Sequence, residues 1–118
     1  MITGLDHVQV AIPVQSETVA RAFYGLLLDM VEVPKPEALA VRGGCWFTAG
    51  AAALHLGVEE AFCPARKAHP AFLVDDVDAL AARLTGAAHG YTWSDEIGQV
   101  RRFHAFDPFG NRIEFQQA

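Results

Sequence analysis

The stretch from Phe103 to Phe115, FHAFDPFGNRIEF, decides the fold that we predict for this chain. Its middle, DPFG at 107–110, has proline and glycine where the second and last positions of a tight turn favour them. The flanking segments at 102–106 and 112–116 place polar side chains between apolar ones, which is typical of half-buried strands. The stretch therefore predicts a closing β-hairpin.

Upstream of the hairpin, the pattern predicts a strand, a helix and a further strand. A strand is expected at 69–74, and a weaker one at 91–94. The helix between them is predicted from apolar residues at helical spacing, namely Val77, Leu80, Ala81 and Leu84. Asp75 or Asp76 can cap its start, and glycines follow its end. The second half thus has the order β-α-β-β-β.

The first half of the chain follows the same order. A strand at 5–12 precedes an amphipathic helix that Ser16 can cap and that continues to about Leu28. Prolines then break the chain, and glycines separate three short strands that we expect at 39–42, 45–48 and 52–57. The repeated order is the main clue to the architecture.

We therefore predict an α+β fold of two βαβββ modules, with curved mixed sheets and the helices outside. Module one is expected at about 1–58, a polar linker at about 59–67 and module two at about 68–118. A length of 118 residues and a hydrophobic content of 52% fit one domain, 1–118, with a single core.

Composition argues against several classes of protein. The formal net charge is −5, and no strip of lysine or arginine could follow nucleic acid phosphates. No apolar run approaches the roughly 20 residues of a membrane helix, and the N-terminus lacks a signal pattern. We expect a cytoplasmic protein in which Cys45 and Cys63, with no CxxC spacing, are reduced structural thiols.

Four potential metal ligands occupy equivalent places in the two modules. The first strands carry His7 and His69, at an offset of 69 − 7 = 62, and the last strands carry His55 and Glu114, at an offset of 114 − 55 = 59. Their strand neighbours are mostly apolar and point to the opposite face. We therefore expect all four ligands on the concave side of the sheet.

Three imidazoles and one carboxylate suit a divalent transition metal, which could be Zn, Ni, Mn, Fe or Co. Such an ion remains a Lewis acid and could take two adjacent substrate oxygens. Arg102, His104 and Phe106 alternate onto one face and are expected to line the cavity. We expect these three residues and Gln9 to bind the substrate.

These residues resemble those of the vicinal oxygen chelate superfamily, which includes glyoxalase I, methylmalonyl-CoA epimerase, fosfomycin-resistance transferases, extradiol dioxygenases and bleomycin-binding proteins. The resemblance spans nearly the whole chain, in the segments LDHVQVAIP, ARAFYGLLLDM, ALHLGV, AHPAFLVDDVDAL and FHAFDPFGNRIEF. It implies metal ligands at the positions of His7, His55, His69 and Glu114. It also implies a homodimer that binds a small-molecule substrate.

The resemblance implies a metal-dependent lyase or isomerase, in which Glu114 serves as the catalytic base for proton removal next to the chelated oxygens. His55 stands where glyoxalase I usually has Glu or Gln. Ala11 stands where that enzyme commonly has an arginine for glutathione, so glutathione is not the expected substrate. Gln9 replaces a threonine of the fosfomycin transferases.

Two other functions stay open at this point. One is a small-molecule or drug-binding protein of the resistance type, suggested by the aromatic residues Trp46, Phe47, Phe106 and Phe109. The other is a dioxygenase, although the usual extradiol enzymes contain four such modules and this chain has room for two. The substrate, the metal and the pairing of modules within or between chains are left open by the sequence.

Overall fold

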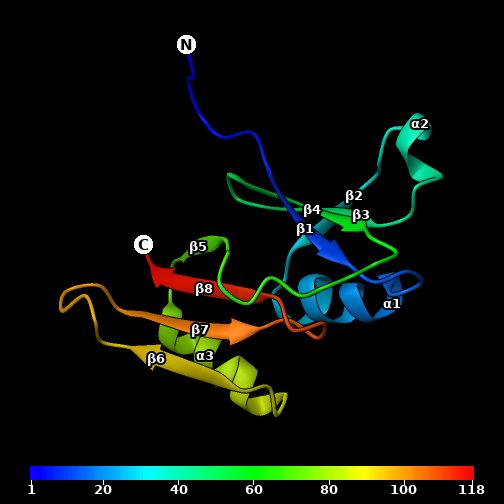
Figure 1. Ribbon diagram of the computed structural model, residues 1–118. Helices are drawn as coiled ribbons and strands as arrows, with labels where there is room; N and C mark the ends of the chain where they lie inside the picture. The colour runs from blue at the N-terminus through cyan, green and yellow to red at the C-terminus, as the bar shows by residue number, and fades with distance from the viewer. The chain divides into compact units, whose positions relative to one another are not determined.

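Each half of the chain folds around its own four-stranded mixed sheet in the computed structural model, which describes all 118 residues (Figure 1). The chain divides into two units, Met1–Cys63 and Pro64–Ala118. The division falls inside the polar segment at 59–67. None of the helices is both long and apolar enough to cross a lipid bilayer.

The sheet of the first unit has the strand order β1-β4-β3-β2. β1 pairs with β4 in parallel, and the other neighbours are antiparallel. The elements of this unit are β1 Val8–Ile12, α1 Glu17–Ala20, the π-helix η1 Arg21–Leu27, β2 Val31–Val33, α2 Glu37–Ala40, β3 Cys45–Ala49 and β4 Ala52–Val58.

The sheet of the second unit has the equivalent order β5-β8-β7-β6, again with one parallel pair, β5 with β8. Its elements are β5 Ala71–Val74, α3 Val77–Gly86, β6 Tyr91–Ser94, β7 Arg102–Phe106 and β8 Arg112–Gln117. The predicted helix start is confirmed, because the Asp76 carboxylate accepts a hydrogen bond from the Ala79 N–H at 2.9 Å.

The register of the two sheets confirms the repeat. Gln9 of β1 lies opposite His55 of β4, and Ala71 of β5 lies opposite Glu114 of β8. Gln9 and Ala71 are separated by 71 − 9 = 62 residues, the same offset as His7 and His69. The predicted α+β fold of two βαβββ modules is therefore correct.

The predicted strand at 39–42 is wrong. The second strand of the first sheet is Val31–Val33, which ends before Pro34 because a proline cannot donate to a strand ladder. Pro36, at φ −53°, instead stands at the start of α2. The short helix therefore occupies the place that apolar residues alone had indicated as a strand.

Ser16 is the N-cap residue of α1, as predicted, but its side chain does not cap the helix. Its hydroxyl donates to the Pro13 carbonyl oxygen at 2.6 Å and makes no bond to the first turn of α1. The helix then widens into η1, where the Leu28 N–H donates to the Phe23 carbonyl, five residues earlier. Gly25 lies in this wide stretch and allows close packing against Phe47 of β3.

Each unit buries one face of its sheet under its helix, and the other face carries the polar candidates. The two cores are built from alternating strand residues and the apolar side of the helices, since neighbouring side chains in a strand point to opposite faces. The large apolar side chains that are fully buried are Ile12, Tyr24, Phe47, Leu54 and Leu56 in the first unit, and Val77, Leu84, Phe103 and Ile113 in the second.

Candidate metal centre

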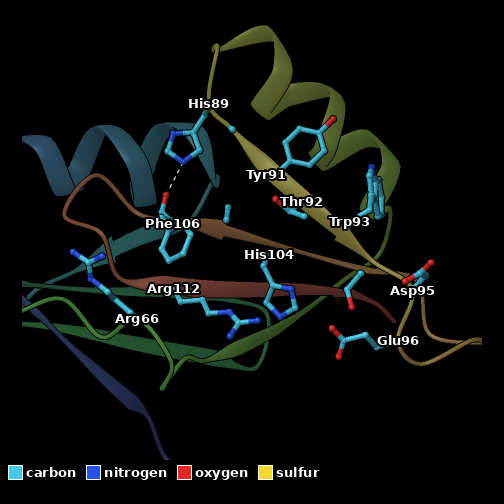
Figure 2. A pocket seen from close by; sticks show the side chains of 13 residues that line it. Arg66, His89, Tyr91, Thr92, Trp93, Asp95, Glu96, His104, Phe106 and Arg112 are labelled. Atoms are coloured by element: carbon cyan, nitrogen blue, oxygen red, sulfur yellow. Dashed lines mark hydrogen bonds between the residues drawn. The ribbon is translucent and has the colours of Figure 1, made fainter.

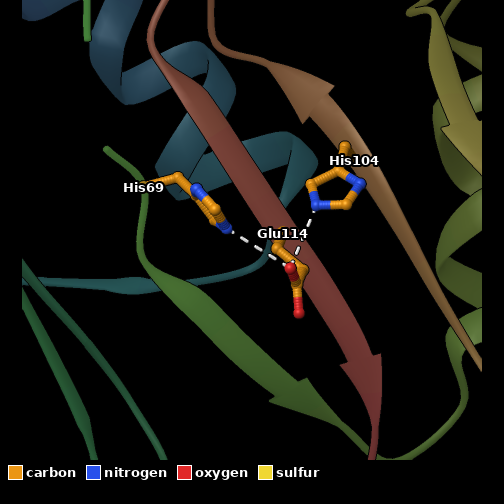
Figure 3. Close-up of side chains that lie close together, drawn as sticks. All are labelled: His69, His104 and Glu114. Carbon is orange, nitrogen blue, oxygen red and sulfur yellow. Dashed lines mark hydrogen bonds and ion pairs between the residues drawn. The ribbon is translucent and has the colours of Figure 1, made fainter. Parts of the chain in front are cut away.

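The second unit brings His69, His104 and Glu114 together on the uncovered face of its sheet (Figure 3). The imidazole Nε2 atoms of His104 and His69 lie 3.0 and 3.3 Å from the same carboxylate oxygen, Oε1 of Glu114. The potential ligand atoms of all three residues lie within 4.8 Å of one another. The two imidazoles thus approach the carboxylate from both sides of β8.

The sheet register explains this convergence. His104 of β7 lies directly opposite Glu114 of β8, because the turn at 107–110 sets the pairing of the closing hairpin. On the other side, the Glu114 N–H donates to the carbonyl of Pro70 at 3.0 Å, which places the preceding residue, His69, beside the carboxylate. The His69 ring is oriented further by a 2.7 Å contact between its Nδ1 and the Lys67 carbonyl.

Arg102 is a third partner of the same carboxylate oxygen. Its Nη1 donates to Oε1 of Glu114 at 2.8 Å, and the side chains of both residues are largely buried. Burial tends to raise the pKa of Glu114, but Arg102 and the two histidines outweigh it, so the pKa of this carboxyl is lowered. Glu114 is therefore ionised at neutral pH.

The His104 ring is uncharged at neutral pH, so one of its nitrogens donates a hydrogen bond and the other can accept one. Burial, followed by the nearby positive charge of Arg112, lowers its pKa, and the hydrogen bond to Glu114 offsets this only in part. A neutral imidazole keeps a nitrogen lone pair available for a metal ion. Lowered proton affinity at His104 thus favours coordination over protonation.

The donor set fits a divalent transition ion. Two imidazoles and one carboxylate are the ligands that Zn, Ni, Co, Mn or Fe accept. Ligand atoms at about 2.1 Å from one ion, at angles of about 90–110°, are separated by about 3.0–3.4 Å. The separations of 3.0 and 3.3 Å from the Glu114 oxygen to the two histidines match that spacing.

The first unit places its two predicted ligands side by side. The rings of His7 and His55 stack with their centroids 3.9 Å apart, and Trp46 stacks on His55 at 3.7 Å and 2°. Asp6 accepts a hydrogen bond from Nδ1 of His7 at 2.8 Å. Burial and the neighbouring His7 both lower the pKa of His55, so this ring is also neutral at neutral pH.

The predicted metal ligands thus form one pair in each unit, His7 with His55 and His69 with Glu114, and their joint coordination of one ion stays a prediction. Among the expected substrate residues, Phe106 is half exposed and Gln9 lies across Gly57, 2.7 Å from where a Cβ would stand. His104 was expected only as a cavity residue. Its place opposite Glu114 could have been read from the hairpin register around the DPFG turn.

Comparison with known proteins identifies the fold's relatives. No protein-family model and no curated protein matches the chain. A solved structure of a glyoxalase family protein from Bacillus anthracis is 50% identical, with a TM-score of 0.97 over 99% of this chain and 96% of that chain.

More distant solved structures share the fold. Lactoylglutathione lyase from Agrobacterium tumefaciens is 18% identical over 94% of this chain and 92% of that chain, with a TM-score of 0.72. The genomically encoded fosfomycin resistance protein FosX from Listeria monocytogenes is 16% identical over 100% of this chain and 95% of that chain, with a TM-score of 0.77.

Proposed function

The chain belongs to the glyoxalase family of the vicinal oxygen chelate superfamily, and on this premise we propose that it is a metal-dependent lyase or isomerase acting on a small substrate with two adjacent oxygens. One observation carries the proposal, namely the buried carboxylate of Glu114 with two imidazole nitrogens at 3.0 and 3.3 Å. The convergence of His69 and His104 supports a metal ligand set.

In this proposal His69, His104 and Glu114 hold the ion in the second unit, and His7 and His55 are the further ligands that the sequence predicts. When bound, a divalent transition ion supplies Lewis acidity toward two neighbouring substrate oxygens. His104 is included because its neutral ring and its distance from Glu114 support the role. The metal's identity is left to the experiment.

The Glu114 carboxylate is the proposed base. Oε1 accepts a hydrogen bond from Arg102 and lies 3.0 and 3.3 Å from the imidazole nitrogens of His104 and His69, so the contacts of this carboxylate are made through one oxygen. Its partner oxygen, Oε2, is the atom that would receive a proton from the substrate carbon next to the chelated oxygens. Arg102 and the two histidines hold the carboxylate in place while the proton is transferred.

Substrate contacts are proposed for Gln9, Arg102, His104 and Phe106. Arg102 has a buried Nε–H without a partner, although its Nη1 is bound to Glu114, so one of its donors is available to a substrate oxygen. Phe106 lines a pocket together with His104 and supplies an apolar wall. The predicted homodimer is a separate proposal, which sedimentation equilibrium tests.

The test is metal binding measured together with activity. Tag-free protein is analysed for bound metal, stripped with chelator and titrated calorimetrically with Zn, Ni, Co and Mn. We expect one ion per chain, and an affinity reduced at least about tenfold by Glu114→Gln or His104→Gln. His89→Gln is the matched control, because His89 contacts the Phe106 carbonyl and lies outside the cluster.

Activity is then screened with α-ketoaldehydes, epoxides and catechols. We expect turnover that chelator abolishes and that Glu114→Gln reduces by several orders of magnitude. Wild-type protein that neither contains nor rebinds a transition metal would remove the basis of the proposal, as would a Glu114→Gln variant equal to wild type in every activity.

A second candidate function is a binding protein for an aromatic or hydrophobic compound. The observation that favours it is the pocket of about 730 Å³ in the second unit, whose wall includes Tyr91, Trp93 and Phe106. Tight binding of such a compound to chelator-treated protein, without turnover, would support this function. Loss of that binding when the metal is removed would instead support the proposed enzyme function.

A further inference from the structure

The pocket of the second unit is electrostatically divided (Figure 2). Arg66 and Arg112 line one end, and Asp95 and Glu96 line the other end. His104 stands between them and belongs both to the pocket lining and to the candidate metal centre. The volume of about 730 Å³ is in the range of sites for small molecules.

The backbone places Arg66 beside the start of the strand that carries Arg112. The Arg112 N–H donates to the Ala65 carbonyl at 2.9 Å, so Arg66 follows directly after a residue bonded to β8. Arg112 precedes Glu114 by two residues on the same strand and therefore shares its face. Figure 2 shows the Arg112 side chain extending toward His104.

Neither guanidinium is neutralised by a carboxylate in the second unit. The arginines of this unit that form ion pairs are Arg101, with Asp78, and Arg102, with Glu114 and Glu96, and neither Arg66 nor Arg112 forms one. Two uncompensated cations in a concave site attract an anion.

Two buried polar atoms near His104 also lack partners. Ser94 lies opposite Arg102 in the β6–β7 ladder, and both the Ser94 hydroxyl and the Arg102 Nε–H are buried without a hydrogen bond. Buried polar groups are normally satisfied, so unpaired donors beside a pocket indicate a place for a polar ligand. These atoms lie toward Asp95 and Glu96, since Arg102 pairs with Gln116 and Arg112 pairs with Phe106 at the other end of the ladder, so a second polar group of the ligand would lie there.

We propose that Arg112 and Arg66 form an anion subsite that binds the carboxylate or phosphonate group of the substrate and directs its reactive carbon toward His104 and Glu114. The assignment of the anion to the substrate rests on the proposed enzyme function. The subsite itself does not, because its arginines belong to no predicted metal ligand set. Arg112 is the principal ligand and Arg66 widens the cation end. The substrate class is a small organic oxyanion with adjacent oxygens.

The subsite is tested on chelator-stripped protein at constant ionic strength. Acetate and methylphosphonate are titrated separately, and binding is followed by NMR shifts of the backbone amides of Thr92 and His104 and of the Arg112 Nε–H group. We expect saturable shifts with at least one of these anions, and the tighter one identifies the head group. Arg112→Gln is expected to weaken binding about tenfold, and Arg66→Gln by a smaller factor.

Arg42→Gln is the matched control, because Arg42 is exposed in the first unit and its removal changes the net charge equally. Wild-type affinity in Arg42→Gln supports the subsite. Equal loss in Arg42→Gln and Arg112→Gln, or no loss in Arg112→Gln and Arg66→Gln, overturns it. Arg66 is exposed, so Arg66→Gln reports on binding even if Arg112→Gln fails to fold.

The two proposals fail separately. If the protein binds methylphosphonate through Arg112 but takes up no metal, the anion subsite is supported and the proposed enzyme function is contradicted. If the protein binds metal through His104 and Glu114 but its anion affinity does not depend on Arg66 or Arg112, the metal centre is supported and the anion subsite is contradicted.

Discussion

Trp46 and His104 occupy equivalent positions in the two sheets, since Trp46 lies opposite His55 in the β3–β4 ladder and His104 lies opposite Glu114 in the β7–β8 ladder. In the first unit this position carries an indole stacked on an imidazole. In the second unit it carries an imidazole 3.0 Å from a carboxylate oxygen. The repeat preserves the position, and the two halves use it for stacking and for polar contact.

The stability of the metal-free protein is expected to fall as the pH drops below 6.5. The folded pKa of His104 lies below its ordinary value of 6.5, mainly because of burial and then Arg112, so unfolded protein takes up this proton first. Above pH 6.5 the ring is neutral in both states and no penalty arises. Urea unfolding at pH 7.5 and 5.5 measures the difference, and His104→Gln should reduce it; an unchanged difference would contradict the assignment.

Arg102→Gln is expected to destabilise the metal-free protein and to strengthen metal binding. The Arg102 guanidinium occupies Oε1 of Glu114 at 2.8 Å, so it stabilises the carboxylate and competes with an incoming cation. Calorimetric titration should show affinity about tenfold higher in the variant. Arg101→Gln is the control, because Arg101 pairs with Asp78 on the surface. Equal or weaker metal binding in Arg102→Gln would exclude the competition.

Gly44→Ala is expected to destabilise the first unit by about 3 kcal/mol or more. Gly44 has a φ of +83°, and a Cβ there would overlap the Leu56 carbonyl oxygen of the neighbouring strand. Gly50→Ala is the control, since its φ is +53° but no atom lies within 4 Å of the added carbon. Its expected cost is about 1 kcal/mol. Denaturant unfolding of both variants tests the difference, which similar costs would contradict.

Asp107→Ala is expected to cost about 3 kcal/mol of unfolding free energy. The buried Asp107 carboxylate accepts hydrogen bonds from the backbone N–H groups of Phe109 and Asn111 and from the Asn111 side-chain amide, each at 2.9 Å. The substitution leaves these donors without their acceptor at the turn that sets the β7–β8 register. Glu60→Ala, in an exposed turn, should change stability by less than about 0.5 kcal/mol.

The two cysteines are expected to differ sharply in reactivity. Burial raises the pKa of Cys45 to about 11, whereas Cys63 is exposed. A thiol reagent at pH 8 should therefore modify one group rapidly in native protein and two in denatured protein. Cys63→Ser should remove the rapid phase. A rapid phase that survives in this variant would show that Cys45 is accessible.

Local sequence determined most of the individual elements. The helix α3 with its Asp76 cap, the strands from Cys45 onward and the hairpin around the DPFG turn were all predictable, because apolar period, capping and turn chemistry act over a few residues. The failures were local as well. The segment at 39–42 was expected to form a strand, but a short helix that begins after Pro36 occupies part of it. The Ser16 hydroxyl bonds to the Pro13 carbonyl and leaves the first turn of the helix without a side-chain cap.

The equivalence of His7 with His69 and of His55 with Glu114 also followed from sequence alone, since repeat offsets survive in the residue numbers. Tertiary structure decided which side chains meet. The contact of Glu114 with His69, His104 and Arg102 requires three strands to pair in one register, and no single segment encodes that register. The stacking of Trp46 on His55 has the same origin. Which side chains occupy equivalent places was thus a property of the sequence, and which of them meet was a property of the paired sheets.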